Sequence, residues 1–111
     1  MDTPLRMTVR WSVSPAESQA IAAVLHGLMA TTRAEPGCLG CSLSTEMSAN
    51  VVLSYVERWH TEGDLIRQLR SDRFAVLAEL MEGTSRRPDV EFVLPTATRR
   101  LDYAEEVREK G

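Results

Sequence analysis

The chain has 111 residues, which is the length of a single domain. Its composition, with 43% hydrophobic and 26% charged residues, is that of an ordinary globular protein. Its formal net charge of -3 argues against nucleic acid or an anionic membrane surface as the main partner. No apolar run approaches the ~20 residues of a membrane span, and residues 1–10 lack the pattern of a signal peptide, so we expect a cytoplasmic protein.

The first half of the chain begins with a predicted strand and helix. Residues 7–13 alternate between apolar and polar side chains, which is typical of a strand. Ser14, Pro15 and Glu17 predict a helix start with a capping box. Apolar residues follow at helical spacing: Ile21, Val24, Leu25, Leu28 and Met29. Residues 35–37, Glu-Pro-Gly, predict the end of this helix.

A predicted hairpin comes next. Residues 39–44 alternate again, with Leu39 and Cys41 expected on one face. Residues 47–50 fit a hairpin loop, and residues 51–59 are rich in the β-branched and aromatic side chains of a strand. Both faces of residues 51–59 would carry apolar side chains, so the sequence leaves the register of this strand open.

The remainder of the domain predicts a second helical region and a last strand. Thr61 with Asp64 predicts the helix start, and Ser71 offers a second cap that would break the helix in two. The apolar stripes are Leu65, Ile66 and Leu69, then Phe74, Leu77, Leu80 and Met81. Gly83 is the expected stop, and residues 90–94 alternate as a strand.

This order predicts an α+β, ferredoxin-like β-α-β-β-α-β domain over residues 1–94, with an antiparallel four-stranded sheet and both helices on one face. The other face is expected to carry Arg6, Thr8, Arg10, Ser42, Ser44 and Val93. If Val52 and Val56 join them, this face is too apolar for water, and a homodimer that packs sheet on sheet would cover it. Residues 95–111 form an extension with a loop at 95–98 and a short helix that either packs on the partner subunit or frays.

Three segments resemble the antibiotic biosynthesis monooxygenase family. Residues 33–40 (Arg-Ala-Glu-Pro-Gly-Cys-Leu-Gly) are similar to its turn into the second strand, and residues 56–59 (Val-Glu-Arg-Trp) to its hallmark at the end of the third. The match continues at Leu65, Leu69, Ser71 and Phe74, so that it spans about residues 5–94. The resemblance implies a dimeric α/β barrel with a pocket between sheet and helices. It also implies oxidation of phenols or quinols by molecular oxygen without flavin, haem or metal, so no cofactor is expected.

The sequence departs from the family pattern at several positions. Gln68 and Arg73 stand where the family often has histidines, and Cys41 stands where an aromatic residue is common. Relatives that degrade haem need an Asn in the first strand, the Trp and a helix histidine. Only Trp59 of that set is present, with Thr8 near the Asn position, so the resemblance does not imply haem degradation.

Glu57 and His60 are the candidate catalytic residues. A carboxylate in an apolar pocket has a raised pKa and could take a phenolic proton. The alternative for Glu57 is a salt bridge, with Arg10 or Arg58 as the partner. Histidine exchanges protons readily near neutral pH, but His60 follows the strand end, where an exposed loop position is the alternative.

Four further residues are candidates for substrate binding. Trp59 offers a flat apolar wall and an N–H donor, and Tyr55 lies on the same strand face with a hydroxyl that would orient a ligand. Trp11 and Gln68 complete the set. The alternative for each tryptophan is simple packing in the core, and the Tyr55 hydroxyl would then only satisfy a buried partner.

Cys38 and Cys41 form a CxxC motif. In a regular strand, positions three apart point to opposite faces, so we expect two reduced thiols that diverge. A zinc site would need about four ligands, and the sequence has no second cysteine pair.

The leading hypothesis is therefore a cofactor-free monooxygenase of a small aromatic or quinol substrate. One alternative is a non-catalytic module of the same fold that binds a small ligand or another protein. Another is an isomerase or lyase that uses the same pocket.

Overall fold

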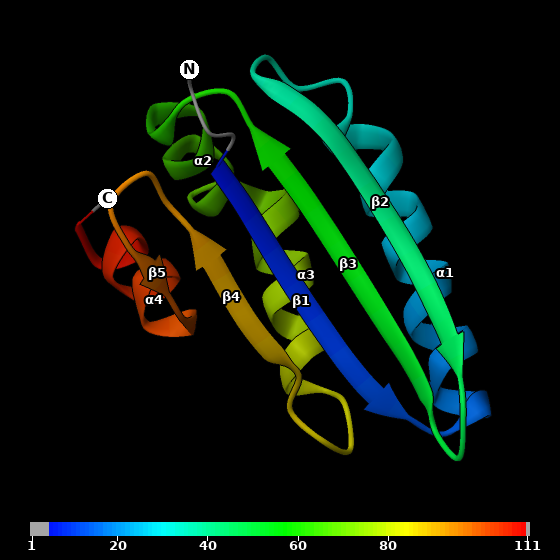
Figure 1. Cartoon of the computed structure of the whole chain (residues 1–111). Coiled ribbons are helices and arrows are strands. Elements are labelled where there is room, and N and C mark those ends of the chain that lie inside the picture. Colours follow the sequence, from blue (N-terminus) through cyan, green and yellow to red (C-terminus); the bar gives the residue numbers. More distant parts are fainter. Residues whose placement is uncertain (1–4, 111) are drawn as a thin grey trace.

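The protein folds into an antiparallel sheet with α1, α2 and α3 on one face (Figure 1). This computed structural model describes residues 5–110; residues 1–4 and 111, which belong to the expected domain and extension, lie outside the described residues. The strands are β1 (Leu5–Val13), β2 (Cys38–Met47), β3 (Val51–Trp59), β4 (Asp89–Val93) and β5 (Thr98–Arg99). The helices are α1 (Pro15–Thr32), α2 (Glu62–Leu69), α3 (Asp72–Glu82) and α4 (Leu101–Lys110). The α+β prediction is confirmed.

The strand order across the sheet is β2-β3-β1-β4-β5, so within residues 5–110 there are five strands where four were expected. The extra strand forms because the chain reverses after β4, with the Leu94 N–H donating to the Ala97 carbonyl at 2.8 Å. Thr98 and Arg99 then pair with Val93 and Phe92 on the free edge of β4. The expected loop at 95–98 therefore ends one residue earlier than predicted.

The starts of the helices follow the capping signals of the sequence. Ser14 accepts the Glu17 N–H at 3.3 Å, which satisfies one free donor of the α1 N-terminus. The carboxylate of Glu17, however, does not complete a capping box; it accepts the Ser85 N–H and hydroxyl at 2.8 and 2.7 Å. The box prediction is wrong because a distant loop offers two donors to the same carboxylate.

The second helical region is two helices, because Ser71 caps α3 by accepting the Phe74 N–H at 3.3 Å. The Ser71 hydroxyl also donates to the Gln68 carbonyl at 2.6 Å, which ties the new start to the end of α2. This junction places the last turn of α2 and the first turn of α3 at different angles to the sheet. Within the described residues no helix is long and apolar enough to cross a membrane.

The register of β3 is resolved by burial. Its odd-numbered residues face the helices and are almost fully buried. Four of these five residues are apolar or aromatic, and the fifth, equally buried, is Glu57. Its even-numbered residues face the other side of the sheet. One of them, Val56, pairs with Thr8 of β1 and with Ser42 of β2. A shallow concavity on that outer face is lined by Arg6, Thr8, Arg10, Ser42, Ser44, Ser54, Val56, Arg58, Glu91 and Val93. The expected outer-face residues are thus found there.

A β-bulge changes the start of β2. Cys38 pairs with Trp59 and Gly40 with Arg58, which leaves Leu39 as an extra residue. Leu39 is 56% exposed, and Cys41 is buried opposite Glu57. Cys38 and Cys41 therefore point to the same inner face, so the expected divergence of the two thiols is wrong, as is the shared face of Leu39 and Cys41.

The extension folds back on its own subunit. α4 packs against α2 and β4, and Tyr103, Ala104 and Val107 are buried there. The Tyr103 ring lies 5.2 Å from the Phe92 ring, and its hydroxyl donates to Glu62 at 2.8 Å. α4 thereby covers the part of the sheet that α1 and α3 leave open (Figure 1).

Gly37 shapes the turn from α1 into β2. Its φ of 85° is the one positive value among the described residues, and L-residues rarely adopt it. A Cβ at this position would collide with the Asp64 carboxylate. That carboxylate is held by the Thr61 hydroxyl at 2.8 Å and by Arg67 at 3.2 Å, so it cannot move without losing both contacts.

We expect Gly37→Ala to lower the free energy of unfolding by about 1–2 kcal/mol, because alanine is strained at this φ and displaces Asp64. Urea denaturation of the variant and the wild type measures the difference. Gly40→Ala is the matched control, since Gly40 has no positive φ and its Cβ would meet open space. Equal losses in the two variants would contradict the account of this turn.

Candidate functional site

A carboxyl group lies at the centre of the buried face of β3. Tyr55, Glu57 and Trp59 share that face because strand residues two apart point the same way. None of the three is more than 1% exposed. A glutamate is rarely buried to this extent unless its oxygens are paired, so its partners are the starting point for any chemistry here.

Both carboxyl oxygens of Glu57 accept hydrogen bonds from its own strand. The Tyr55 hydroxyl donates to Oε2 at 2.5 Å, and the Trp59 indole N–H donates to Oε1 at 3.1 Å. The Cys41 thiol lies 3.3 Å from the Tyr55 hydroxyl oxygen and donates to it. The strand pairing produces this chain of donors, because Cys41 is directly opposite Glu57 on β2.

The helical side of the site is formed by the junction of α2 and α3. Gln68, only 2% exposed, closes over the carboxyl from α2, and its Oε1 accepts the Arg73 Nε–H at 3.0 Å. Arg73 also forms an ion pair with Glu35 in the turn before β2. A cavity of about 10 Å³ lies between these side chains and the edge of Trp59. We refer to Cys41, Tyr55, Glu57, Trp59 and Gln68 as the Glu57 cluster.

Burial dominates the electrostatics of the cluster. It raises the pKa of Glu57, while hydrogen bonds from Tyr55, Trp59 and Gln68 and the charge of Arg73 act to lower that pKa. Burial, followed by the neighbouring Glu57 carboxylate, raises the pKa of Tyr55. Burial also raises the pKa of Cys41, to about 11. Near neutral pH the thiol and the tyrosine hydroxyl therefore keep their protons and act as hydrogen-bond donors, and the Glu57 carboxyl is the acceptor on which these bonds converge.

Glu57 faces the helices, so the alternative of a salt bridge with Arg10 or Arg58 is wrong. Both arginines line the outer face of the sheet, where the Arg10 Nε–H donates to Ser54 at 3.4 Å. The side of the sheet on which each side chain lies decides this question, because a side chain on one side cannot reach a partner on the other.

The other candidate residues lie outside the Glu57 cluster. Trp11 is fully buried and pairs with Leu53, further along the sheet, and its indole N–H has no hydrogen-bond partner among the described residues. His60 is exposed after the end of β3, with its backbone N–H donating to the Gly37 carbonyl at 2.8 Å. His26 is exposed on α1. The structure thus brings together Tyr55, Glu57, Trp59 and Gln68, and leaves Trp11 and His60 apart from them.

Sequence reasoning missed the part of Glu35 in this site. Glu35 was identified only as part of a helix stop, and Arg73 only as a departure from a histidine pattern. A local pattern could not reveal their ion pair, because 38 positions separate them and the contact depends on how α3 packs beside α1.

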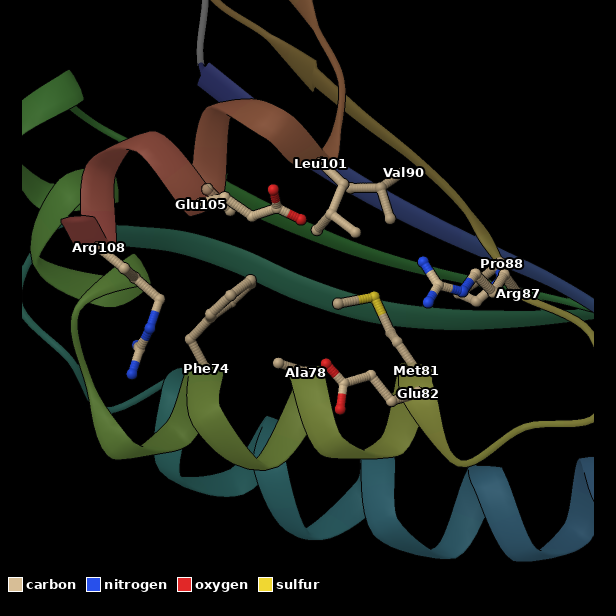
Figure 2. A pocket seen from close by; sticks show the side chains of 11 residues that line it. Phe74, Ala78, Met81, Glu82, Arg87, Pro88, Val90, Leu101, Glu105 and Arg108 are labelled. Atoms are coloured by element: carbon tan, nitrogen blue, oxygen red, sulfur yellow. The ribbon is translucent and has the colours of Figure 1, made fainter.

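A larger groove lies elsewhere, between α3, β4 and α4. Figure 2 shows Phe74, Ala78 and Met81 on the side of α3 that faces Leu101 of α4. The groove holds about 230 Å³, and its rim carries Glu82, Arg87, Glu105 and Arg108. We refer to it as the α3–α4 groove. None of its lining residues belongs to the Glu57 cluster, and no sequence pattern predicted the groove, because it depends on where α4 docks.

Neither region gathers the ligands that a metal ion would need. Within residues 5–110, no three His, Cys, Asp or Glu side chains come close enough together to hold one. Cys38 and Cys41 are both free thiols.

Comparisons with known proteins agree with this geometry. The family model described as "Antibiotic biosynthesis monooxygenase" matches residues 4–80. A conserved protein from Methanosarcina mazei is 24% identical with a TM-score of 0.70, covering 81% of this chain and 90% of its own. A protein from Pseudomonas aeruginosa is 24% identical with a TM-score of 0.70, covering 87% and 98%. A proposed antibiotic biosynthesis monooxygenase from Caulobacter crescentus is 23% identical with a TM-score of 0.69, covering 81% and 87%.

At these identities the solved structures establish the fold alone. No curated protein sequence is significantly similar to the chain. The family match therefore carries the assignment, and the chemistry has to be argued from the residues of this chain.

The pKa of Glu57 gives a pH dependence of stability with a definite sign. A folded-state pKa above the ordinary 4.5 means that the folded state holds the proton more tightly than the unfolded state. The contribution of Glu57 to stability is therefore complete below about pH 4.5 and is lost as the pH rises through the folded-state pKa. Its slope reaches at most about 1.4 kcal/mol per pH unit.

We expect Glu57→Gln to remove this loss, so that the free energy of unfolding of the wild type, minus that of the variant, falls as the pH rises above 4.5. Denaturation at a series of pH values measures both. The subtraction is needed because Glu17 and Asp64, whose pKa values are lowered by hydrogen bonds to Ser85 and Thr61, act in the opposite direction. A difference that is flat with pH would contradict the raised pKa.

Proposed function

The chain belongs to the antibiotic biosynthesis monooxygenase family, and on that premise we propose that it oxidises a small aromatic or quinol substrate with molecular oxygen and no bound cofactor. The observation that carries the proposal is the buried Glu57 carboxyl, with Trp59 and Tyr55 fixed on either side of it. Such a carboxyl is a suitable proton acceptor in a site that excludes water.

In the proposed reaction Glu57 takes the hydroxyl proton of the substrate. The resulting phenolate forms a carbon–oxygen bond with molecular oxygen, and the hydroperoxide so formed loses one water to leave a quinone, so that the substrate itself supplies the electrons that reduce oxygen. The apolar surroundings keep bulk water away from the oxygen adduct. Trp59 presents its ring to the substrate while its N–H holds one carboxyl oxygen, and Tyr55 supports the carboxyl from the other side. Cys41 donates to Tyr55 and thereby keeps the tyrosine hydroxyl directed at Glu57.

The proposed substrate approaches from the α2–α3 junction. The cavity of about 10 Å³ beside Trp59 is no larger than the space needed for one water molecule. An aromatic ring therefore requires Gln68 and the Glu35–Arg73 ion pair to move outward, and the break between α2 and α3 is where the backbone can allow it. His60 is exposed one residue beyond Trp59, and a role in passing the proton to water stays a prediction, as does substrate contact by Trp11.

The α3–α4 groove favours a second candidate, a module that binds a small ligand without catalysis. Its volume of about 230 Å³ is below the ~300–1,000 Å³ of drug-sized sites but is suited to one or two rings. It has apolar walls from Phe74, Met81 and Leu101, and it needs no rearrangement to admit a ligand. An isomerase or lyase acting at the Glu57 cluster is the third candidate, and it would convert its substrate without consuming oxygen.

Oxygen uptake with a panel of quinols tests the leading proposal. We expect uptake above the autoxidation rate with the wild type, and a rate lower by about 10²–10⁴-fold with Glu57→Gln, since that variant cannot accept the proton. Trp59→Ala should also reduce uptake, because the wall beside the substrate is lost. His26→Ala, on the exposed side of α1, is the control that should keep the wild-type rate.

Wild-type uptake no faster than autoxidation across the panel would overturn the monooxygenase proposal. Ligand binding without uptake would then favour the binding module, and conversion of a substrate without uptake would favour the isomerase or lyase.

We further propose that the protein forms a homodimer through the outer face of its sheet. Val56 of β3 and Val93 of β4 flank the central strand β1, where Thr8 lies opposite Val56 and Arg6 lies opposite Val93. Arg6, Arg10 and Arg58 lie on the same face, so a partner would cover the two valines together with the aliphatic stems of these arginines. The approach of the same face of a second copy is the arrangement that the twofold symmetry of most dimers requires.

Sedimentation at micromolar concentration tests the dimer. We expect the wild type to sediment at twice the 12.4 kDa chain mass, and Val56→Lys to dissociate because it replaces an apolar contact of the interface with a fourth cation on this face. Val76→Lys is the matched control, since Val76 is 44% exposed on α3, away from the sheet. A single 12.4 kDa species for the wild type would contradict the dimer.

A further inference from the structure

We infer that Glu35 and Arg73 are positioning residues for Glu57, which they influence by holding the Gln68 carboxamide in one of its two orientations. The inference rests on the proposed function for its catalytic meaning, but the geometry on which it stands is independent of any substrate. It assigns a role to an ion pair that neither touches the Glu57 carboxyl nor lies on the same strand.

The argument begins with the two ends of a carboxamide. Gln68 has an oxygen that can only accept and a nitrogen that can only donate. The Arg73 Nε–H donates to Gln68 Oε1 at 3.0 Å, which commits the oxygen to the Arg73 side. The amide nitrogen is then the end that is left for Glu57, and the hydrogen bond from Gln68 acts in the same direction as those from Tyr55 and Trp59.

The opposite orientation would reverse the effect on Glu57. If Gln68 turned over, its oxygen would face the carboxyl oxygens, and a dipole that stabilises the carboxylate would oppose it instead. Gln68 is only 2% exposed, so water cannot compensate for the wrong orientation. Arg73 therefore decides whether Gln68 helps or hinders the loss of the Glu57 proton.

Glu35 in turn decides where Arg73 lies. The two side chains form an ion pair in which they remain 32% and 26% exposed. Glu35 itself is held by its backbone: its N–H donates to the Thr32 carbonyl at 3.0 Å, and its carbonyl accepts the Cys38 N–H at 3.1 Å. The anchoring of Arg73 is thus traced to the end of α1, on the opposite side of the junction from Gln68.

The groups that surround Glu57 define what else contributes to its titration. The titratable or charged ones are Tyr55 from its own strand, Cys38 and Cys41 from β2, and Arg73 from α3. Tyr55 and both thiols hold their protons near neutral pH, because burial raises their pKa values. Arg73 is therefore the neighbour whose replacement changes both the nearby charge and the orientation of Gln68.

The experiment is a titration of the Glu57 carboxyl carbon by NMR in protein labelled at glutamate, with the signal assigned by its absence in Glu57→Gln. We expect Gln68→Met and Arg73→Met each to raise the Glu57 pKa by about one to two pH units, because the first removes a donor to the carboxylate and the second removes both a nearby cation and the hydrogen bond that orients this donor. Glu35→Gln, which preserves shape, should raise it by less. Arg67→Met is the control: Arg67 lines the same cavity but pairs with Asp64, so the titration should stay at the wild-type value.

Two further results separate positioning from a general loss of structure. Arg73→Lys retains the charge but not the directed Nε–H, so it should recover only part of the shift. The double variant Gln68→Met, Arg73→Met should shift the pKa by less than the sum of the two single shifts, because only the charge of Arg73 acts directly on Glu57 and the remainder of its effect acts through Gln68. An Arg73→Met titration equal to that of the wild type, or full additivity of the two shifts, would overturn the inference.

The titration also stands apart from the proposed reaction. If the protein consumes oxygen with a quinol, the acidic limb of its pH–rate profile should move upward by the same interval in Arg73→Met. If the pKa shifts are seen and no oxygen is consumed, the positioning role is upheld and the monooxygenase proposal fails. If oxygen is consumed and the pKa does not shift, the proposal is upheld and the positioning role fails.

Discussion

The structure depends on the need to satisfy one buried carboxyl group. Glu57 occupies a position on β3 where every other side chain of the same face is apolar or aromatic. An isolated ionised carboxyl would be very costly there, and the protein offsets the cost with donors from its own strand and from one helix. The identities of Tyr55, Trp59 and Gln68, and the closeness of α2 to β3, follow from that single requirement.

The same requirement links parts of the chain that are distant in sequence. β2 contributes Cys41, which holds the Tyr55 hydroxyl, and the α2–α3 junction contributes Gln68, which Arg73 holds. A hydrogen-bond network of this kind is strong only when every polar group in it has a partner. The low polarity of the interior strengthens each hydrogen bond and raises the free-energy cost of each unpaired polar group. The break between α2 and α3 therefore matters to this network, because it brings Arg73 of α3 to Gln68 of α2, the side chain that lies over the carboxyl.

Much of this could be predicted from the sequence, and the limits have physical causes. The shared face of Tyr55, Glu57 and Trp59 follows from the period of a strand, and the cap at Ser71 follows from its local hydrogen-bonding capacity. The direction of that face could not be predicted, because both sides of β3 carry apolar residues. The Glu35–Arg73 pair and the α3–α4 groove could not be predicted either, since each depends on how separate helices dock.

The bulge at the start of β2 has a consequence for how the chain tolerates length changes. Leu39 adds one residue to β2 without adding one to β3, so the residues that precede Leu39 are shifted by one position relative to their partners on β3. Cys38 lies opposite Trp59 and faces inward for this reason, and the turn that bears Glu35, the partner of Arg73, directly precedes it. A chain one residue shorter here would keep its hydrophobic pattern and its length of helix, yet it would present the wrong side of that turn to Arg73. The extra residue, Leu39, thus determines how the turn that bears Glu35 is aligned with the helix that bears Arg73.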